Sequence, residues 1–148
     1  MIISYKFKMT LTVYSYNSRG FDISKQDICK VLMTESENNL SILCNQENFL
    51  LKGNCFIVKQ CLPKFHIFFK PAVKEGLTGQ PKNGLFVAIP NMLMKFATDV
   101  SPVSHRIQAI SIKLGGKTIL LINAYFPTDA QKSGDDMTDL LTTLLAVQ

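Results

Sequence analysis

The sequence predicts a single α/β domain, from its length, its composition and the order of its apolar segments. The chain has 148 residues, of which 47% are apolar, and this is enough for one hydrophobic core. Only 18% of the residues are charged and ten are phenylalanine, which excludes a largely disordered chain. Near the N-terminus, two strand-like runs flank a segment of helical periodicity. That order is typical of an α/β fold.

The two strand-like runs are residues 11–16 and residues 40–46. The first alternates β-rich residues, and the second is an apolar run of strand length. With a helix between them they form a β-α-β unit, and a right-handed crossover makes the two strands parallel. We therefore expect the residues that follow them, Asn17 and Glu47, to lie at the same edge of the sheet.

The intervening helix is predicted from Ser24 to about residue 35. Ser24 and Asp27 have the spacing of a capping box, in which the first residue caps the helix and the second bonds back to it. Three apolar residues at helical spacing form the predicted buried face: Ile28, Val31 and Leu32.

The middle of the chain is predicted as two strands separated by a loop. Residues 65–69 and residues 85–89 have strand character, and Pro90 ends the second strand. The loop covers residues 71–83, which include lysines and two glycines.

The last third of the chain is predicted as a hairpin followed by a helix. Residues 107–114 and residues 118–124 are the two strands, joined by a tight turn at Gly115 and Gly116. A break follows, because Pro127 cannot donate to the strand ladder. Residues 136–147 are predicted as an amphipathic helix, with an apolar stripe of Met137, Leu140, Leu141, Leu144 and Leu145.

The cysteines predict neither a zinc site nor a disulfide framework. Cys29, Cys44, Cys55 and Cys61 include no C-x-x-C pair, and neither histidine lies at metal-ligand spacing from one of them. We expect reduced and mostly buried thiols, because a chain of this size can form a core without disulfides.

Positive charge is concentrated in the middle of the chain. Residues 52–117 hold ten Lys/Arg and two acidic residues, a net charge of +8, within a chain whose net charge is +5. Such a segment suits a partner rich in phosphate, such as nucleic acid. A solvated face of spaced lysines explains it equally well, so charge leaves the function open.

No feature of the sequence predicts a membrane or secreted protein. No window reaches 18 apolar residues, and the N-terminal segment lacks the apolar region and cleavage pattern of a secretory signal. We expect an intracellular protein, nuclear or cytoplasmic, without a membrane partner.

Three polar residues, Asn17, Glu47 and Tyr125, each directly follow a predicted strand. Ligands of open α/β folds bind beyond the strand ends, so these residues are candidates for a site. A carboxylate in Glu47's position suits Mg²⁺, which takes one or two protein carboxylates and completes its shell with water and phosphate. Taken singly, each residue has an equally good structural explanation. Asn17 could be a turn residue, Glu47 an exposed loop acid and Tyr125 a half-buried aromatic residue.

Four motifs, taken in order, resemble the endonuclease/exonuclease/phosphatase family over residues 11 to about 130. They are Tyr-Asn-x-Arg-Gly at 16–20, Leu-Cys-x-Gln-Glu at 43–47, Gly-Leu-Phe-Val-Ala-Ile at 84–89 and Ile-Asn-Ala-Tyr-Phe-Pro-Thr at 122–128. Ser-His-Arg-Ile at 104–107 and Ala-Tyr-Phe-Pro-Thr-Asp at 124–129 most resemble the apurinic-type endonuclease domain of non-LTR retrotransposons.

The resemblance implies a metal-dependent phosphodiesterase that nicks DNA. By analogy, Glu47 would bind Mg²⁺, with Mn²⁺ as a substitute, Asn17 would position the metal or the attacking water, and Tyr125 would contact the scissile phosphate. It also makes Arg19, Arg106 and Thr128 candidate DNA-binding residues. Arg106 is explained equally well as an arginine at a strand edge that binds no DNA.

The chain departs from the family pattern in two ways. Repair-type members usually carry an acidic residue at the position of Arg19, so this arginine favours the retrotransposon type. The family's later Asp-x-Asn and Asp-His motifs have no counterpart here.

The family fold is a four-layer α/β sandwich (DNase I-like), a type that needs roughly 200 to 250 residues. We therefore expect this sandwich truncated after its first half, with an extension at residues 1–10, a partial domain at 11–148 and no activity by itself.

Three rival interpretations remain open. The chain could be a nucleic-acid-binding remnant that uses the basic segment without catalysis. It could belong to the branch of the superfamily that cleaves phospholipids or inositol phosphates. It could also be a fragment that does not fold stably, because the inner face of a half sandwich would be exposed.

Overall fold

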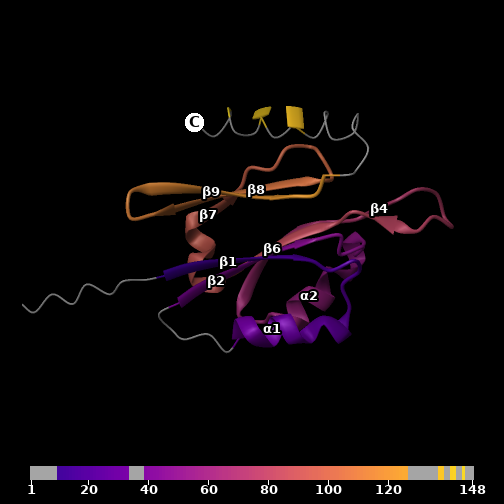
Figure 1. Ribbon diagram of the computed structural model, residues 1–148, viewed down its shortest axis with the longest axis horizontal. Coiled ribbons are helices and arrows are strands. Elements are labelled where there is room, and N and C mark those ends of the chain that lie inside the picture. The colour runs from indigo at the N-terminus through magenta and orange to yellow at the C-terminus, as the bar shows by residue number, and fades with distance from the viewer. Residues whose placement is uncertain (1–9, 34–38, 127–136, 139–140, 143–144, 146–148) are drawn as a thin grey trace, which may run out of the picture.

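The computed structural model describes residues 10–33, 39–126, 137–138, 141–142 and 145. Two β-sheets are stacked on one another, and two helices cover the outer face of the first sheet (Figure 1). This mixed α/β arrangement confirms the predicted fold class. The four-layer sandwich and its truncation after the first half stay predictions.

The first sheet has the order β1-β2-β6-β3. Strands β1 (Thr10–Asn17) and β2 (Asn39–Gln46) are parallel, as predicted, and their register pairs Asn17 with Gln46. Strands β6 (Leu85–Pro90) and β3 (Phe65–Lys70) continue the sheet in antiparallel pairing. Because β2 and β6 are central, their neighbouring strands and the layers on both faces of the sheet bury them, which explains the continuous apolar sequence of β6.

The first helix begins differently from the prediction. A 3-10 turn, η1 (Ile23–Lys25), precedes α1 (Gln26–Met33). Asp22 caps this turn by accepting a hydrogen bond from the backbone nitrogen of Ser24 at 2.8 Å, so the predicted cap at Ser24 is wrong. The reason is that a carboxylate two residues earlier reaches the first free amides of the turn.

The buried face of α1 also differs from the prediction. Cys29 is 2% exposed and Ile28 packs against the core, whereas Val31 is 52% exposed. With 100° between successive residues, a face centred on Cys29 turns Val31 about 200° away toward solvent. The predicted place of Val31 on the buried face is therefore wrong.

A helix and a short hairpin in the middle of the chain were not predicted. The short turn η2 (Lys52–Asn54) leads into α2 (Cys55–Cys61), which buries Val58 completely and is followed by the equally buried Leu62. Within the predicted loop, β4 (Val73–Lys74) pairs with β5 (Pro81–Lys82), two strands of two residues each.

The second sheet has the order β7-β8-β9. Strands β8 (Ile107–Leu114) and β9 (Lys117–Ala124) form the predicted hairpin. Gly115 and Gly116 both have positive φ, of 56° and 76°, which is the conformation that a two-residue turn between twisted strands requires. The turn η3 (Asn91–Phe96) connects the two sheets, and neither this turn nor strand β7 (Ala97–Asp99) was predicted.

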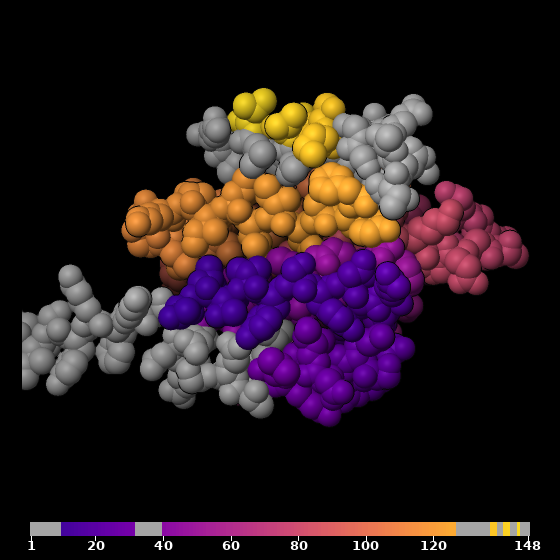
Figure 2. Space-filling view, viewed as in Figure 1, coloured from indigo at the N-terminus to yellow at the C-terminus, as the bar shows by residue number. Residues whose placement is uncertain are grey.

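The first sheet has an apolar core on each of its faces. Leu43, Phe86 and Ala88 point toward the helices, whereas Ile42, Val87 and Ile89 point toward the second sheet. This is the two-residue alternation of strands that are buried on both sides. The inner face of the first sheet is therefore covered by β8 and its neighbours rather than exposed (Figure 2).

The predicted C-terminal helix lies mostly outside the described residues. Residues 137–138, 141–142 and 145 are helical. Of the predicted stripe, the side chains of Met137, Leu141 and Leu145 are exposed, and Leu140 and Leu144 lie outside the described residues. In the part of the chain that the structure describes, no helix is long and apolar enough to cross a membrane.

All four cysteines are free thiols, as predicted. Cys29 and Cys44 are buried, whereas Cys55 and Cys61 are half-buried.

Candidate functional site

Asn17 and Glu47 lie side by side where β1 and β2 end. The Asn17 Nδ2 group donates a hydrogen bond of 2.7 Å to Glu47 Oε2. The parallel register, with Asn17 opposite Gln46, places the two residues together. The predicted juxtaposition at one sheet edge is thus confirmed, although the residues are 30 positions apart in sequence.

Tyr125 joins this pair from the second sheet. Its backbone nitrogen donates to Arg106 O at 2.9 Å, which extends the pairing of β8 and β9 by one step. Its hydroxyl is hydrogen-bonded to the Glu47 carboxylate. This bond, some burial and the negative charge of Glu47 together raise the pKa of the Tyr125 hydroxyl above its usual 10.0. Three residues from three strand ends therefore meet at one carboxylate.

Two arginines, Arg106 and Arg19, lie close enough to the Tyr125 hydroxyl to affect its pKa. Their positive charges lower this pKa, whereas Glu47 raises it. Arg19 is exposed and Arg106 is half-buried. The site thus combines one carboxylate with two guanidinium groups, and guanidinium is well suited to phosphate oxygens. Thr128, the other predicted DNA-binding residue, lies outside the described residues.

The backbone at this edge is held in an unusual conformation. Arg19, Glu47 and Phe49 have positive φ, of 45°, 51° and 58°, which non-glycine residues rarely adopt. Hydrogen bonds beyond the strand ends keep this conformation, including Gly20 N to Glu47 O at 2.7 Å and Phe21 N to Asn48 O at 2.9 Å. Strained residues of this kind cluster at functional sites, where their position is part of the function.

A buried polar network supports the site from behind. The Asn123 side chain, 1% exposed, accepts from Gln46 Nε2 at 2.6 Å and donates to Asn45 O at 3.0 Å and Phe86 O at 3.1 Å. The Asn45 side chain in turn accepts from Ser18 Oγ at 3.2 Å. The network ties β9 to β2 and β6, and therefore one sheet to the other.

The residues of this network were not predicted to belong to the site. Asn45, Gln46 and Asn123 lie within apolar strands and inside two of the family-like motifs. Polar residues inside a buried strand were the available signal, because a buried amide needs hydrogen-bond partners.

The turn that carries Glu47 is fastened to the segment before β6. Asn48 N donates to Gly84 O at 3.2 Å, and Phe49 N donates to Asn83 O at 3.1 Å. Gly84 has φ of +90°, and a Cβ atom there would lie 2.3 Å from Asn48 Oδ1. Only glycine allows this approach, which explains the glycine at the start of the third motif.

Lys70 holds the loop that leads to Arg106. Its ammonium group donates to three backbone carbonyls, those of Pro102 at 2.8 Å, Ser104 at 2.5 Å and Ile107 at 2.8 Å. This fixes the loop before β8 to the end of β3, and charged hydrogen bonds of this kind are among the stronger ones.

The residues present fit a weakly held Mg²⁺ ion rather than a closed metal cage. Among the described residues, no three His, Cys, Asp or Glu side chains cluster as a metal site. One carboxylate, Glu47, is sufficient for Mg²⁺ when water and substrate phosphate complete the shell. Asn17 turns its amide nitrogen toward Glu47, and its Oδ1 accepts from Arg19 N at 3.1 Å. In this arrangement Asn17 orients the carboxylate, and a role as metal ligand stays a prediction.

The Glu47–Tyr125 contact predicts a pH effect. Glu47 favours the neutral form of the Tyr125 hydroxyl, so this hydroxyl should ionise above pH 10.0. Its contribution to the stability of the fold should be lost as the pH rises through the raised pKa. Replacing Glu47 by glutamine removes the negative charge and should lower the pKa of Tyr125. Carbon NMR of the tyrosine rings, with Tyr125→Phe to assign the signal, measures the midpoint. An unchanged midpoint in Glu47→Gln would contradict this contact.

Comparisons with known proteins show a likeness in fold. No family model matches the chain, and no curated protein matches it. Among solved structures, it is similar to the AP endonuclease LMAP from Leishmania major, with a TM-score of 0.57 and 13% sequence identity. The match covers 78% of this chain and 40% of the endonuclease. The chain thus has the fold of part of that enzyme and spans less than half of its length.

Proposed function

We propose that this sheet edge is the metal- and phosphate-binding part of a Mg²⁺-dependent phosphodiesterase that nicks DNA. The observation that carries the proposal is the convergence on Glu47. Its carboxylate receives hydrogen bonds from Asn17 of the first sheet and from Tyr125 of the second. The fold shared with part of an AP endonuclease supports the same class of activity.

Each residue has a role that its surroundings support. Glu47 would hold Mg²⁺, or Mn²⁺ in its place, and the ion would polarise the phosphate and stabilise the departing 3′ oxygen. Asn17 keeps the carboxylate oriented through the 2.7 Å bond. The Tyr125 hydroxyl is close enough to Glu47 to donate to a phosphate oxygen bound there. Arg19 and Arg106 supply positive charge for the flanking phosphates.

DNA is the proposed substrate, and a retrotransposon origin is the finer part of the proposal. The net charge of +8 over residues 52–117 favours a polyanionic partner. The arginine at position 19 and the motifs at 104–107 and 124–129 favour the retrotransposon type of endonuclease. Thr128 and the +8 segment are the proposed remaining DNA contacts.

The proposal is tested by Glu47→Gln, which keeps the size of the side chain and removes its charge. Mn²⁺ binding, measured by the relaxation of water protons, is expected to weaken about tenfold or more. Because the later Asp-x-Asn and Asp-His motifs of the family have no counterpart in this chain, we expect no nicking by the chain alone, and Mn²⁺ binding is the deciding measurement. Glu75→Gln is the matched control, because Glu75 is an exposed acid that pairs with Lys82 in the β4–β5 hairpin. If Glu47→Gln binds Mn²⁺ as the wild type does, the metal site is not here.

The +8 segment favours a second candidate function, nucleic-acid binding without cleavage. A binder of this kind retards DNA in a gel, and its affinity falls steeply with salt because phosphate contacts release counterions. The two candidates differ in the effect of Glu47→Gln. Retardation and Mn²⁺ binding that are both unchanged by this substitution support the binder.

A further inference from the structure

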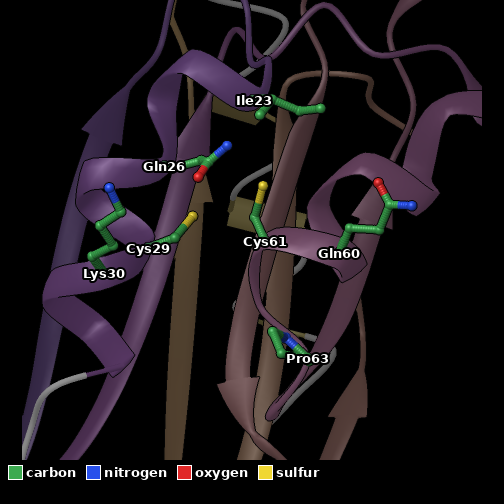
Figure 3. Close-up of a pocket in the computed structure, with 7 residues that line it drawn as sticks. All are labelled: Ile23, Gln26, Cys29, Lys30, Gln60, Cys61 and Pro63. Carbon is green, nitrogen blue, oxygen red and sulfur yellow. The ribbon is translucent and has the colours of Figure 1, made fainter.

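A pocket lies between α1 and α2, on the far side of the first sheet from the second sheet. Its volume is about 500 Å³, and it is open to solvent between the two helices (Figure 3). Gln26 and Lys30 of α1 and Gln60 of α2 line it, together with two cysteines, Cys29 and Cys61. No residue of the proposed phosphodiesterase site lines this pocket.

The two thiols in this pocket face each other from different helices. Cys29 lies in α1 and is 2% exposed, whereas Cys61 ends α2 and is half-buried. The Cys29 thiol is hydrogen-bonded to Cys61. Figure 3 shows both sulfur atoms directed into the space between the helices. The two residues are 32 positions apart, so only the packing of the helices brings them together.

The other two cysteines do not belong to this pair. Cys44 lies in β2 and points into the core between the sheets, on the opposite face of the first sheet from Cys29. Burial raises its pKa to about 12, so it stays a protonated thiol at neutral pH. Cys55 is at the other end of α2 and does not line the pocket.

We propose that Cys29 and Cys61 are a peroxide-sensitive dithiol, which hydrogen peroxide converts into a disulfide linking α1 to α2. Cys61 is the thiol that peroxide reaches first, because it is the more exposed of the two. Burial, the charge of Cys61 and the hydrogen bond to it raise the pKa of Cys29 to about 12. Cys29 is thus kept protonated and reacts second.

The reaction consumes one peroxide and releases two water molecules. The Cys61 thiolate attacks one peroxide oxygen, the O–O bond breaks, and the departing hydroxide takes up a proton to form the first water. Cys61 is then a sulfenic acid. The Cys29 sulfur attacks the Cys61 sulfur, the S–O bond breaks, and the hydroxide leaves with the Cys29 proton as the second water. Two thiols are oxidised and the peroxide is reduced.

The disulfide would close a loop over residues 29–61, which contains β2 and the turn that carries Glu47. A crosslink of this length restricts the unfolded chain, so the melting temperature should rise by about 10 °C. A thiol reductant should reverse the change, because the pocket leaves the bond accessible.

Peptide mapping of the folded chain tests the pairing directly. Each cysteine falls in a different tryptic peptide: Cys29 in 26–30, Cys44 in 31–52, Cys55 in 53–59 and Cys61 in 60–64. The folded protein is treated with one equivalent of hydrogen peroxide, the remaining thiols are alkylated, and the digest is analysed without reduction. The expected main product is peptide 26–30 joined to peptide 60–64, with a loss of two hydrogen atoms.

Two variants make the outcome decisive. Cys55→Ser should form the linked pair and show the rise in melting temperature, whereas Cys61→Ser should show neither. The inference fails if Cys61 is recovered as a sulfinic acid while Cys29 is fully alkylated. It also fails if the linked peptides include Cys55 or join two chains.

Discussion

Asn123→Ala is expected to lower the free energy of unfolding by about 4 kcal/mol, because the substitution removes the buried side-chain hydrogen bonds that join β9 to the first sheet. The Asn123 amide is the only side chain through which β9 bonds to both Asn45 O and Phe86 O within the described residues. Without this amide, both carbonyls have one hydrogen-bond donor fewer. Gln46 Nε2 also loses its acceptor, Asn123 Oδ1, which lies 2.6 Å away. The shorter side chain leaves a cavity between the sheets. These losses occur where water cannot replace the missing partner.

Urea unfolding followed by circular dichroism measures this effect. Asn54→Ala is the matched control, because the Asn54 side chain is exposed and makes no cap hydrogen bond to α2, so its change should stay within about 0.5 kcal/mol. A loss below about 1 kcal/mol in Asn123→Ala would show that the two sheets do not depend on this network. The variant should also weaken Mn²⁺ binding, since Gln46 precedes Glu47.

Gly84→Ala is expected to lower the free energy of unfolding by about 3 kcal/mol. The added Cβ would lie 2.3 Å from Asn48 Oδ1 and 3.3 Å from the Ala72 Cβ, and the backbone has φ of +90°, which alanine adopts only under strain. Asn48 cannot move away easily, because its Oδ1 accepts from Leu50 N at 2.9 Å and its Nδ2 is already buried without a partner among the described residues. The turn that carries Glu47 must therefore shift.

Gly53→Ala provides the control for this substitution. Gly53 lies in η2, where an added Cβ meets nothing within 4 Å, so the alanine should change the stability by no more than about 0.5 kcal/mol. Chemical denaturation compares the two variants, and the Mn²⁺ relaxation measurement reports whether Glu47 has moved. A Gly84→Ala protein as stable as Gly53→Ala would show that the junction between Asn48 and Gly84 is not tight in solution.

The strand predictions succeeded because their signals are local. In β8 and β9 the paired glycines and the apolar runs on either side specify a hairpin without help from the rest of the chain. In β1 and β2 the helix between them and the handedness of the crossover were enough to predict parallel strands, and hence the meeting of Asn17 and Glu47. Both inferences use only order, period and chirality.

The failures occurred where a neighbour decides between local alternatives. A capping box at Ser24 is a sound local motif, but the Asp22 carboxylate reaches the same amides first. Val31 fits the helical period, yet the sheet packs against the side centred on Cys29. The seven residues of α2 form too short a segment to show a clear helical period. The helix is stabilised by the burial of Val58 in the core, which the local sequence does not reveal.

Sequence patterns were sufficient to predict the α/β class, the order of the main strands along the chain and the two residues that meet at the end of the parallel pair. These depend on periodicity and chain direction, which each segment carries alone. The contacts of Tyr125 with Glu47, of Asn123 with the first sheet and of Cys29 with Cys61 arise only when the chain folds. Those contacts join segments 32 to 78 residues apart, and their distances follow from how the sheets and helices pack, which no local pattern encodes.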